Sequence, residues 1–208
     1  MDTESTTNVF QAVLGAKAIK WDAFWHLFEW LLNVEEGHVG DRMRNQLVNH
    51  AFDERDAVCT IKREYPVSGQ TDGKGKWADF ALGIPNLANP KYLIVMDDIA
   101  YAGSGGMRKL NNLSSYLKFS IELRPDAAVR VIAVTDAPIG QKLKTVVYQT
   151  LGQETAQFDS QVGWKLLPLQ TIGSWIQCIV GSENGELSDK MKMILGDLTE
   201  WCNGLKVV

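Results

Sequence analysis

The chain has 208 residues and a formal net charge of −4. Hydrophobic residues make up 45% and charged residues 22%, which is typical of a globular domain and argues against a disordered chain. No apolar run approaches the roughly 20 residues that span a bilayer, and the acidic charge disfavours a protein that coats nucleic acid. The N-terminus, Met1–Asn8, lacks the pattern of a signal peptide. We therefore expect one domain with a cytoplasmic location.

The N-terminal part of the chain predicts two helices after a loose tail of about ten residues. In Ala18–Asn33, apolar residues recur at intervals of three and four, as they do on one face of a helix. This segment carries Trp21, Trp25 and Trp30, which indicate a packed face or, alternatively, a surface for a homodimer or a protein partner. A second helix is expected over Asp41–Phe52.

Three strands are predicted next. Val58–Val67 and Lys76–Ile84 are separated by the polar segment Ser68–Gly75, which predicts a hairpin. Lys91–Ile99 is almost continuously apolar, which is typical of a central strand that is covered on both faces.

The remainder of the chain alternates between predicted helices and strands. Hairpins pair strands antiparallel, whereas strand–helix–strand connections pair them parallel. The predicted fold class is therefore α/β, with a mixed β-sheet flanked by helices on both faces. Residues 1–33 would form the tail and Trp-rich helix, 34–170 the core, and 171–208 the C-terminal helices. The later elements are helices at Met107–Leu123, Leu143–Leu151, Ser174–Val180 and Leu187–Trp201, and strands at Val129–Thr135 and Trp164–Leu169.

Several common types of site have no support in the sequence. Cys59, Cys178 and Cys202 are widely spaced and form no zinc motif, so we expect reduced and mostly buried thiols. Gly103–Gly106 lacks the Gly-Lys-Ser/Thr ending of a phosphate-binding loop and is expected to be a plain loop. The chain also lacks a nucleophile elbow and a dinucleotide-binding fingerprint.

Acidic residues interrupt two of the predicted strands. Asp79 lies between Ala78 and Phe80, and Asp97 and Asp98 end the apolar run of the third strand. Burying an isolated carboxylate is costly, but two carboxylates on adjacent strands can hold Mg²⁺ and so promote phosphodiester hydrolysis. The alternatives are a strand-end turn for Asp97 and Asp98 and an outward-facing position for Asp79.

This arrangement resembles the PD-(D/E)XK nuclease superfamily over residues 34–135. That family has an Asp on its second core strand, a third strand ending in (D/E)-x-K, and often a Gln-Leu-x-x-Tyr signature on the next helix. Asp79 matches the first Asp, although Ala78 replaces the usual Pro. Asp97 best matches the second acid, and Asn112–Tyr116 resembles the helix signature with Asn in place of Gln.

The resemblance implies a restriction endonuclease-like core that hydrolyses DNA with Mg²⁺, or Mn²⁺, as cofactor. Asp79 and Asp97 would then bind the metal. The family's first-helix glutamate would fall near Glu36, where it would assist the metal or its water. Glu35 and Asp41 compete for that role, and nothing in the local sequence decides between them.

The chain departs from the family pattern at one catalytic position. Ile99 occupies the place of the lysine that orients or activates the attacking water. In some members of the family the basic residue has moved to the following helix, where Lys109 or Arg108 would replace it here. The isoleucine also favours an alternative, namely a catalytically inactive protein with the nuclease fold that binds nucleic acid or a protein partner.

Overall fold

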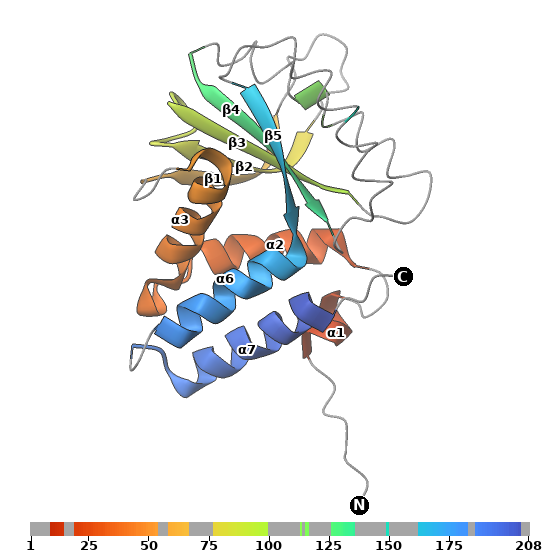
Figure 1. Ribbon diagram of the computed structural model, residues 1–208, viewed down its shortest axis with the longest axis vertical. Coiled ribbons are helices and arrows are strands. Elements are labelled where there is room, and N and C mark those ends of the chain that lie inside the picture. The colour runs from red at the N-terminus through yellow and green to blue at the C-terminus, as the bar shows by residue number, and fades with distance from the viewer. Residues whose placement is uncertain are drawn as a thin grey trace, which may run out of the picture. The chain divides into compact units, whose positions relative to one another are not determined.

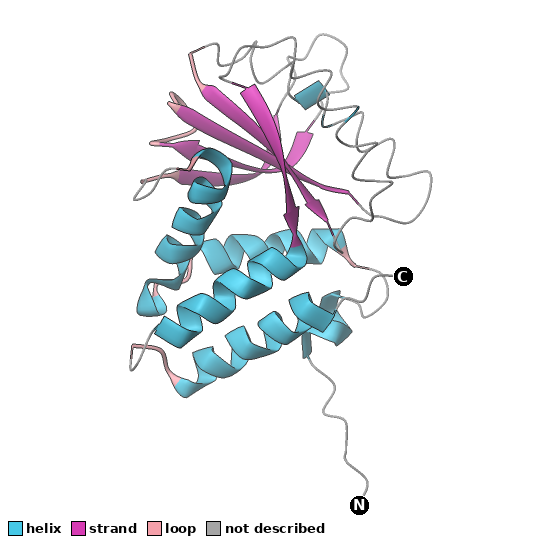
Figure 2. Ribbon diagram, viewed as in Figure 1, coloured by secondary structure: helices cyan, strands magenta, loops and turns pink. Residues whose placement is uncertain are grey.

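The chain divides into two compact units in a computed structural model (Figure 1). Residues 1–43 and 169–208 form the first, which we call the helical unit, and residues 44–168 form the second, the sheet unit. All the described strands belong to the sheet unit (Figure 2). The residues that the structure describes are 9–14, 19–53, 58–66, 77–99, 113, 115–116, 126–135, 149, 162–182 and 186–204.

The helical unit contains the helices from both ends of the chain. The two C-terminal helices, α6 (Leu169–Ser182) and α7 (Asp189–Gly204), are longer than the helices predicted there from the sequence. The first helix, α1 (Val9–Leu14), was not predicted. A further helix, α3 (Val39–Phe52), begins in this unit and ends in the sheet unit. The other helices are α2 (Trp21–Leu32) and η1 (Glu36–His38).

Aromatic side chains form much of the core of the helical unit. Phe24, Trp25 and Phe28 of α2 are buried, as the apolar pattern predicts for a packed face. The ring of Phe24 stacks on Phe28 at a centroid distance of 5.7 Å and on Trp201 of α7 at 6.4 Å. Trp30 lies off this face and is 38% exposed. The spacing of apolar residues in α2 therefore identifies its buried face correctly.

The sheet unit contains one mixed sheet of five strands in the order β1-β2-β3-β4-β5. Strands β1, β2 and β3 pair antiparallel, whereas β3, β4 and β5 pair parallel. The predicted α/β class with a mixed sheet is confirmed. The strands are β1 (Thr60–Pro66), β2 (Trp77–Ile84), β3 (Tyr92–Ile99), β4 (Ala128–Thr135) and β5 (Val162–Pro168).

The C-terminal half of α3 packs on one face of this sheet. The ring of Phe52 lies 4.7 Å from that of Tyr92 on β3, and the Arg130 guanidinium of β4 lies 5.1 Å from the Phe52 centroid. His50 Nε2 lies 3.0 Å from the carbonyl oxygen of Leu166 on β5. These contacts fix α3 against three neighbouring strands.

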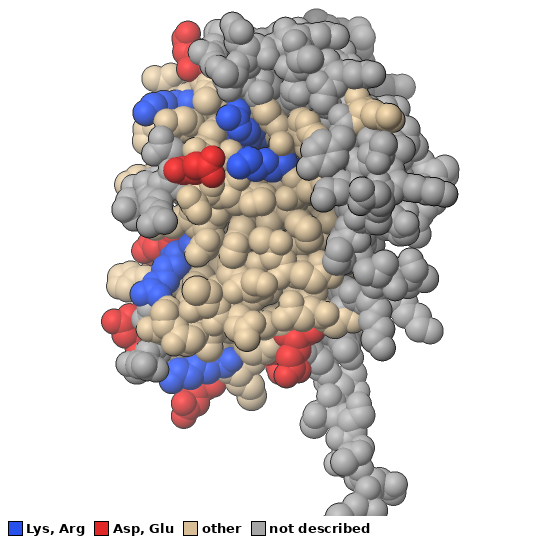
Figure 3. Space-filling model, viewed as in Figure 1, with Lys and Arg blue, Asp and Glu red and all other residues tan. Residues whose placement is uncertain are grey.

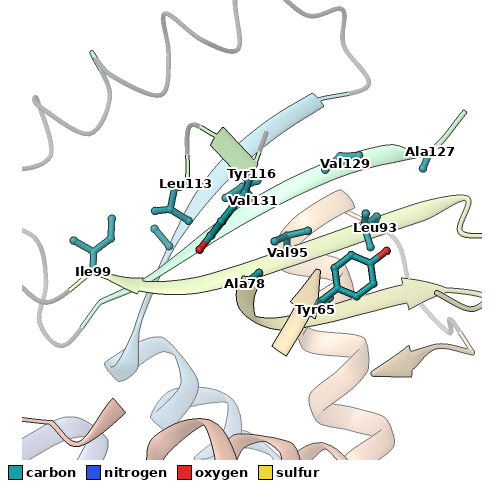
Figure 4. Packing of buried hydrophobic residues seen from close by; sticks show 12 residues of the cluster. Tyr65, Ala78, Leu93, Val95, Ile99, Leu113, Tyr116, Ala127, Val129 and Val131 are labelled. Atoms are coloured by element: carbon teal, nitrogen blue, oxygen red, sulfur yellow. The ribbon is translucent and has the colours of Figure 1, made fainter. Parts of the chain in front are cut away.

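Helical residues also cover the opposite face. Side chains alternate along a strand, so Val95 and Ile99 of β3 point away from the face that carries Tyr92. Leu113 and Tyr116, which are helical, pack with Val95 and Ile99 in a buried cluster (Figure 4). Helical residues therefore lie on both faces of the sheet, as the near-continuous apolar run of β3 predicts.

Some expectations fail or fall outside the described residues. The three cysteines form no disulfide, but only Cys202 is buried; Cys59 is half-buried and Cys178 exposed, so the expectation of mostly buried thiols is wrong. The loop at 103–106 and most of the predicted helices 107–123 and 143–151 lie outside the described residues. Within the described part of the chain, every helix is too short or too polar to cross a membrane.

His50 makes the stability of the sheet unit depend on pH. Burial lowers the pKa of its imidazole below the usual value, so the folded protein resists its protonation while the unfolded chain does not. The stability from neutral His50 is present above the unfolded pKa of about 6.5. It is lost as the pH falls through that value towards the folded pKa.

We therefore expect the free energy of unfolding to fall more steeply for the wild type than for His50→Gln as the pH is lowered from about 7 to 5. Glutamine can still donate to the Leu166 carbonyl but does not titrate. Urea unfolding at several pH values measures the two slopes, and equal slopes would contradict the assignment.

Candidate metal centre

The pairing of β2 with β3 brings two of the predicted site residues to one end of the sheet. The last described pair of these antiparallel strands is Phe80 with Met96. Asp79 precedes Phe80 and Asp97 follows Met96, so the register continues from the last pair directly to the two aspartates. Because β3 is the central strand, this end of it has neighbours on both sides.

Three aspartates meet at this end of β3. One carboxylate oxygen from each of Asp79, Asp97 and Asp98 lies within 4.8 Å of the other two. Asp97 is 4% exposed and Asp98 is 1% exposed, whereas Asp79 is half-buried. The structure therefore brings the two predicted metal ligands together and adds a third acid to them.

This spacing is compatible with direct ligation of a divalent cation. Two oxygens on opposite sides of an ion are separated by twice the metal–oxygen distance. This oxygen–oxygen separation is about 4.2 Å for Mg²⁺ and about 4.6–5.2 Å for Ca²⁺. The 4.8 Å limit of the three aspartate oxygens lies within the span for Ca²⁺ and somewhat above the span for Mg²⁺.

Hydrogen bonds hold Asp97 in place. The backbone N–H of Asp98 donates to Asp97 Oδ1 at 2.8 Å. The hydroxyl of Tyr116 lies 3.0 Å from Asp97 Oδ2 and also lies 2.7 Å from the carbonyl oxygen of Trp77. Tyr116 therefore connects the end of β3 to the beginning of β2.

The Tyr116 hydroxyl has one hydrogen and two acceptors. If Asp97 is ionised, this hydrogen is shared between the Asp97 carboxylate and the Trp77 carbonyl. If Asp97 is protonated, its carboxyl group donates to Tyr116 while Tyr116 donates to Trp77, and each contact has its own hydrogen. Burial and then the charge of Asp97 raise the pKa of Tyr116 far above its usual value, so the phenol stays protonated and acts as a donor.

Charge repulsion makes this cluster expensive unless it is offset. Two ionised carboxylates 4.8 Å apart repel by about 3 kcal/mol at an effective dielectric constant of about 20. A proton, a basic side chain or a bound metal ion would remove this cost. Of these, a divalent cation also uses the oxygens as ligands, which is the chemistry suited to hard carboxylate donors.

The backbone of β1 is distorted beside Asp79. The pairs Arg63–Phe80 and Tyr65–Ala78 flank Glu64 and Asp79 on opposite strands. Glu64 has a φ of 49°, in the left-handed region that residues other than glycine rarely adopt. Such strain collects at functional sites more often than elsewhere, and here it lies next to the half-buried acid of the cluster.

Ile99 lies where the resemblance places a lysine. Its side chain is 1% exposed and belongs to the cluster that contains Leu113 and Ala133. This position of β3 is therefore part of the hydrophobic core.

Glu36 has a defined partner within the helical unit. Its carboxylate accepts a hydrogen bond from the backbone N–H of Ser188 at 2.6 Å. This bond, followed by one with the Ser188 side chain, lowers the pKa of Glu36. The next residue, Gly37, has a φ of 57°, and a Cβ there would lie 2.6 Å from Leu187 Cδ2. These contacts give Glu36 a role in joining η1 to the segment before α7.

The sequence left Asp98, together with Asp97, open between a strand-end turn and a metal site, and it gave no role in the site to Tyr116, which contacts the cluster. Asp98 follows Asp97 directly, and strand alternation places it on the opposite face. Tyr116 is visible only as part of the Asn112–Tyr116 signature, and its two acceptors come from distant segments. Lys109 and Arg108, the predicted replacements for the lysine, lie outside the described residues.

Comparisons of the chain with protein-family models, with curated proteins and with solved structures find no match. The geometry of the three aspartates is therefore the basis for any functional assignment.

Removing the Tyr116 hydroxyl tests its role in the cluster. Tyr116→Phe keeps the ring but removes the donor to Asp97 and Trp77, so we expect a loss of about 1–3 kcal/mol in the free energy of unfolding. Tyr65→Phe is the matched control, because Tyr65 is a buried tyrosine of the same hydrophobic cluster. Urea unfolding measures both variants, and equal losses would contradict a specific role for Tyr116.

Cation binding to the cluster should stabilise the fold. A ligand that binds only the folded state adds about 2.7 kcal/mol at 100 times its Kd, so Mg²⁺ or Mn²⁺ should raise the Tm of the wild type. Asp79→Asn, which changes a half-buried ligand with little change in shape, should abolish the shift. The control Asp126→Asn alters an exposed aspartate of the sheet unit and should keep it. A thermal unfolding series with and without each cation decides the matter.

Proposed function

We propose that Asp79, Asp97 and Asp98 bind a divalent cation, Mg²⁺ or Mn²⁺, and that the protein hydrolyses phosphodiester bonds in DNA. The observation that carries the proposal is the meeting of these three carboxylates within 4.8 Å at the end of the central strand. The resemblance of this region to PD-(D/E)XK nucleases supports the same assignment, because it was drawn from Asp79 and Asp97 independently of their positions in space.

A divalent cation at this place would activate water, polarise the phosphoryl group and offset negative charge on the leaving oxygen. The protein's own residues would divide the remaining work. Asp97 is restrained by the Asp98 N–H and Tyr116, which suits a ligand that must keep its position. Asp79 is half-buried and would lie nearest to solvent and substrate. Tyr116 would act as a donor that orients Asp97.

On the one face drawn in Figure 3, the charges of the described residues are consistent with recognition at the cluster and do not form a broad basic surface. Basic and acidic side chains of the described residues are interspersed on the face drawn in Figure 3. Proteins that grip the nucleic-acid backbone over many phosphates usually concentrate Lys and Arg on one face. In the proposal, a bound cation supplies the main attraction for phosphate oxygens.

A second function is favoured by Ile99. The lysine of the family pattern stabilises developing negative charge, and an isoleucine packed in the core cannot replace it. The alternative proposal is therefore a protein that keeps the nuclease-like arrangement but acts by binding nucleic acid or a protein partner. It differs from the first proposal in predicting no cleavage under any metal condition.

The test is cleavage of supercoiled plasmid and of single-stranded and double-stranded oligonucleotides with Mg²⁺ or Mn²⁺. We expect wild-type cleavage to stop when the cation is chelated and to fall about 100-fold or more in Asp79→Asn, because ligand loss removes charge stabilisation from the transition state. Asp126→Asn should cleave normally. Cleavage that survives Asp79→Asn, or no cleavage of any substrate, would refute hydrolysis at this cluster.

Glu36→Gln separates two roles for Glu36 in the same assay. If Glu36 assists the metal, as the resemblance implies, cleavage should fall while stability changes little. If its function is the hydrogen bond to Ser188, stability should fall while the cleavage rate of the folded protein is kept.

A further inference from the structure

We propose that the indole of Trp77 is a stacking platform for an unpaired nucleobase next to the metal centre, so that the substrate is single-stranded or carries an unpaired base. This inference rests on the proposed function and specifies its substrate class. Trp77 is the first residue of β2. It lies beside the aspartate cluster and is not part of it.

Trp77 is 52% exposed although it belongs to a strand of the sheet. Its neighbour Ala78 is fully buried and Asp79 is half-buried, so the strand itself is well packed at this point. Among the described aromatic residues of the sheet unit, Trp77 is the only one with an exposed side chain. Packing of the sheet does not account for this exposure, because the indole leaves half of its apolar surface in water.

The position of Trp77 relates it directly to the cluster. Side chains two residues apart on a strand point to the same side and are separated by about 7 Å. Trp77 and Asp79 have this relation on β2. A separation of this size is comparable to the span between a phosphate and the base of the same nucleotide. A phosphate at the aspartate cluster would therefore place a base within reach of the indole.

The backbone of Trp77 is also fixed to the cluster. Its carbonyl oxygen lies 2.7 Å from the Tyr116 hydroxyl, and the same hydroxyl lies 3.0 Å from Asp97 Oδ2. On the other side, Trp77 pairs with Pro66 of β1. The start of β2 is thus held at a defined distance from the proposed metal ligands. A stacking platform requires such a fixed position.

The chemistry of an exposed indole selects unpaired bases. A flat aromatic surface stacks on the face of any base with little sequence preference, and indole is a large surface that loses little conformational freedom on binding. In an intact duplex both faces of each internal base are already stacked on neighbours. Single strands, ends and extruded bases are therefore the forms that can use Trp77.

The experiment measures binding of a fluorescein-labelled oligodeoxythymidylate, and of the same strand in a duplex, by anisotropy with Ca²⁺ present. We expect Trp77→Leu to weaken single-strand binding about 5- to 150-fold, which is the range for loss of one base–aromatic stack. Trp77→Phe keeps an aromatic face and should retain most of the affinity. Duplex binding should change little in either variant.

Trp30→Ala is the matched control, because Trp30 is an exposed tryptophan that belongs to the helical unit. This substitution should leave single-strand binding unchanged. Far-ultraviolet circular dichroism and urea unfolding check that each variant is folded. Leucine preserves the apolar bulk at position 77, so a difference between Trp77→Leu and Trp77→Phe reports stacking. Single-strand affinities of these two variants that agree within twofold would overturn the proposal.

The two proposals fail in different ways. If Asp79→Asn abolishes cleavage but Trp77→Leu binds single strands as tightly as the wild type, the stacking platform is wrong and the metal centre stands. If the wild type cleaves nothing but single-strand binding depends on the aromatic face at position 77, hydrolysis is wrong and the platform stands as a binding site.

Discussion

The structure of the candidate site is governed by the meeting of three carboxylates at the end of one strand. Asp79, Asp97 and Asp98 have oxygens within 4.8 Å of one another, and two of the side chains are almost fully buried. Repulsion at this separation is of the order of several kcal/mol when all are ionised, so a positive charge or a proton at the cluster would stabilise the arrangement. Tyr116 restrains one member of the cluster through a hydroxyl that also holds the start of β2.

The mixed pairing of the sheet explains why these residues meet. Strand β3 runs antiparallel to β2, so the end of β3 lies beside the beginning of β2, where Asp79 and Trp77 are found. Because β3 is also parallel to β4, the end of the strand is flanked on both sides and its acidic residues become buried. The antiparallel neighbour thus provides the half-buried Asp79, and the parallel neighbour encloses Asp97 and Asp98.

Much of this could be predicted from the sequence, because the signals are local. Alternation and turn residues locate β1, apolar segments locate the other strands, and Asp79 and Asp97 are conspicuous as acids in apolar strands. Asp98, together with Asp97, was left open between a strand-end turn and a metal site, and its meeting with Asp79 is not expected from strand alternation, which would place adjacent residues on opposite faces. The function of Tyr116 could not be foreseen, since its two acceptors belong to β2 and β3 and depend on tertiary packing. Solvent exposure of Cys178 likewise depends on how α6 packs, which its own sequence does not determine.

The burial of Ile99 bears differently on the two parts of the proposed function, namely cation binding and phosphodiester hydrolysis. A lysine at this position would place an ammonium group among Leu113, Ala133 and Val95, where desolvation would oppose its charge. Position 99 is therefore part of the hydrophobic core, and a lysine there would have to be desolvated. Tyr116 cannot substitute as a base, because its raised pKa keeps it protonated. Any hydrolysis must then rely on water activated by the cation itself or on a basic group from another segment, while cation binding requires only the three aspartates.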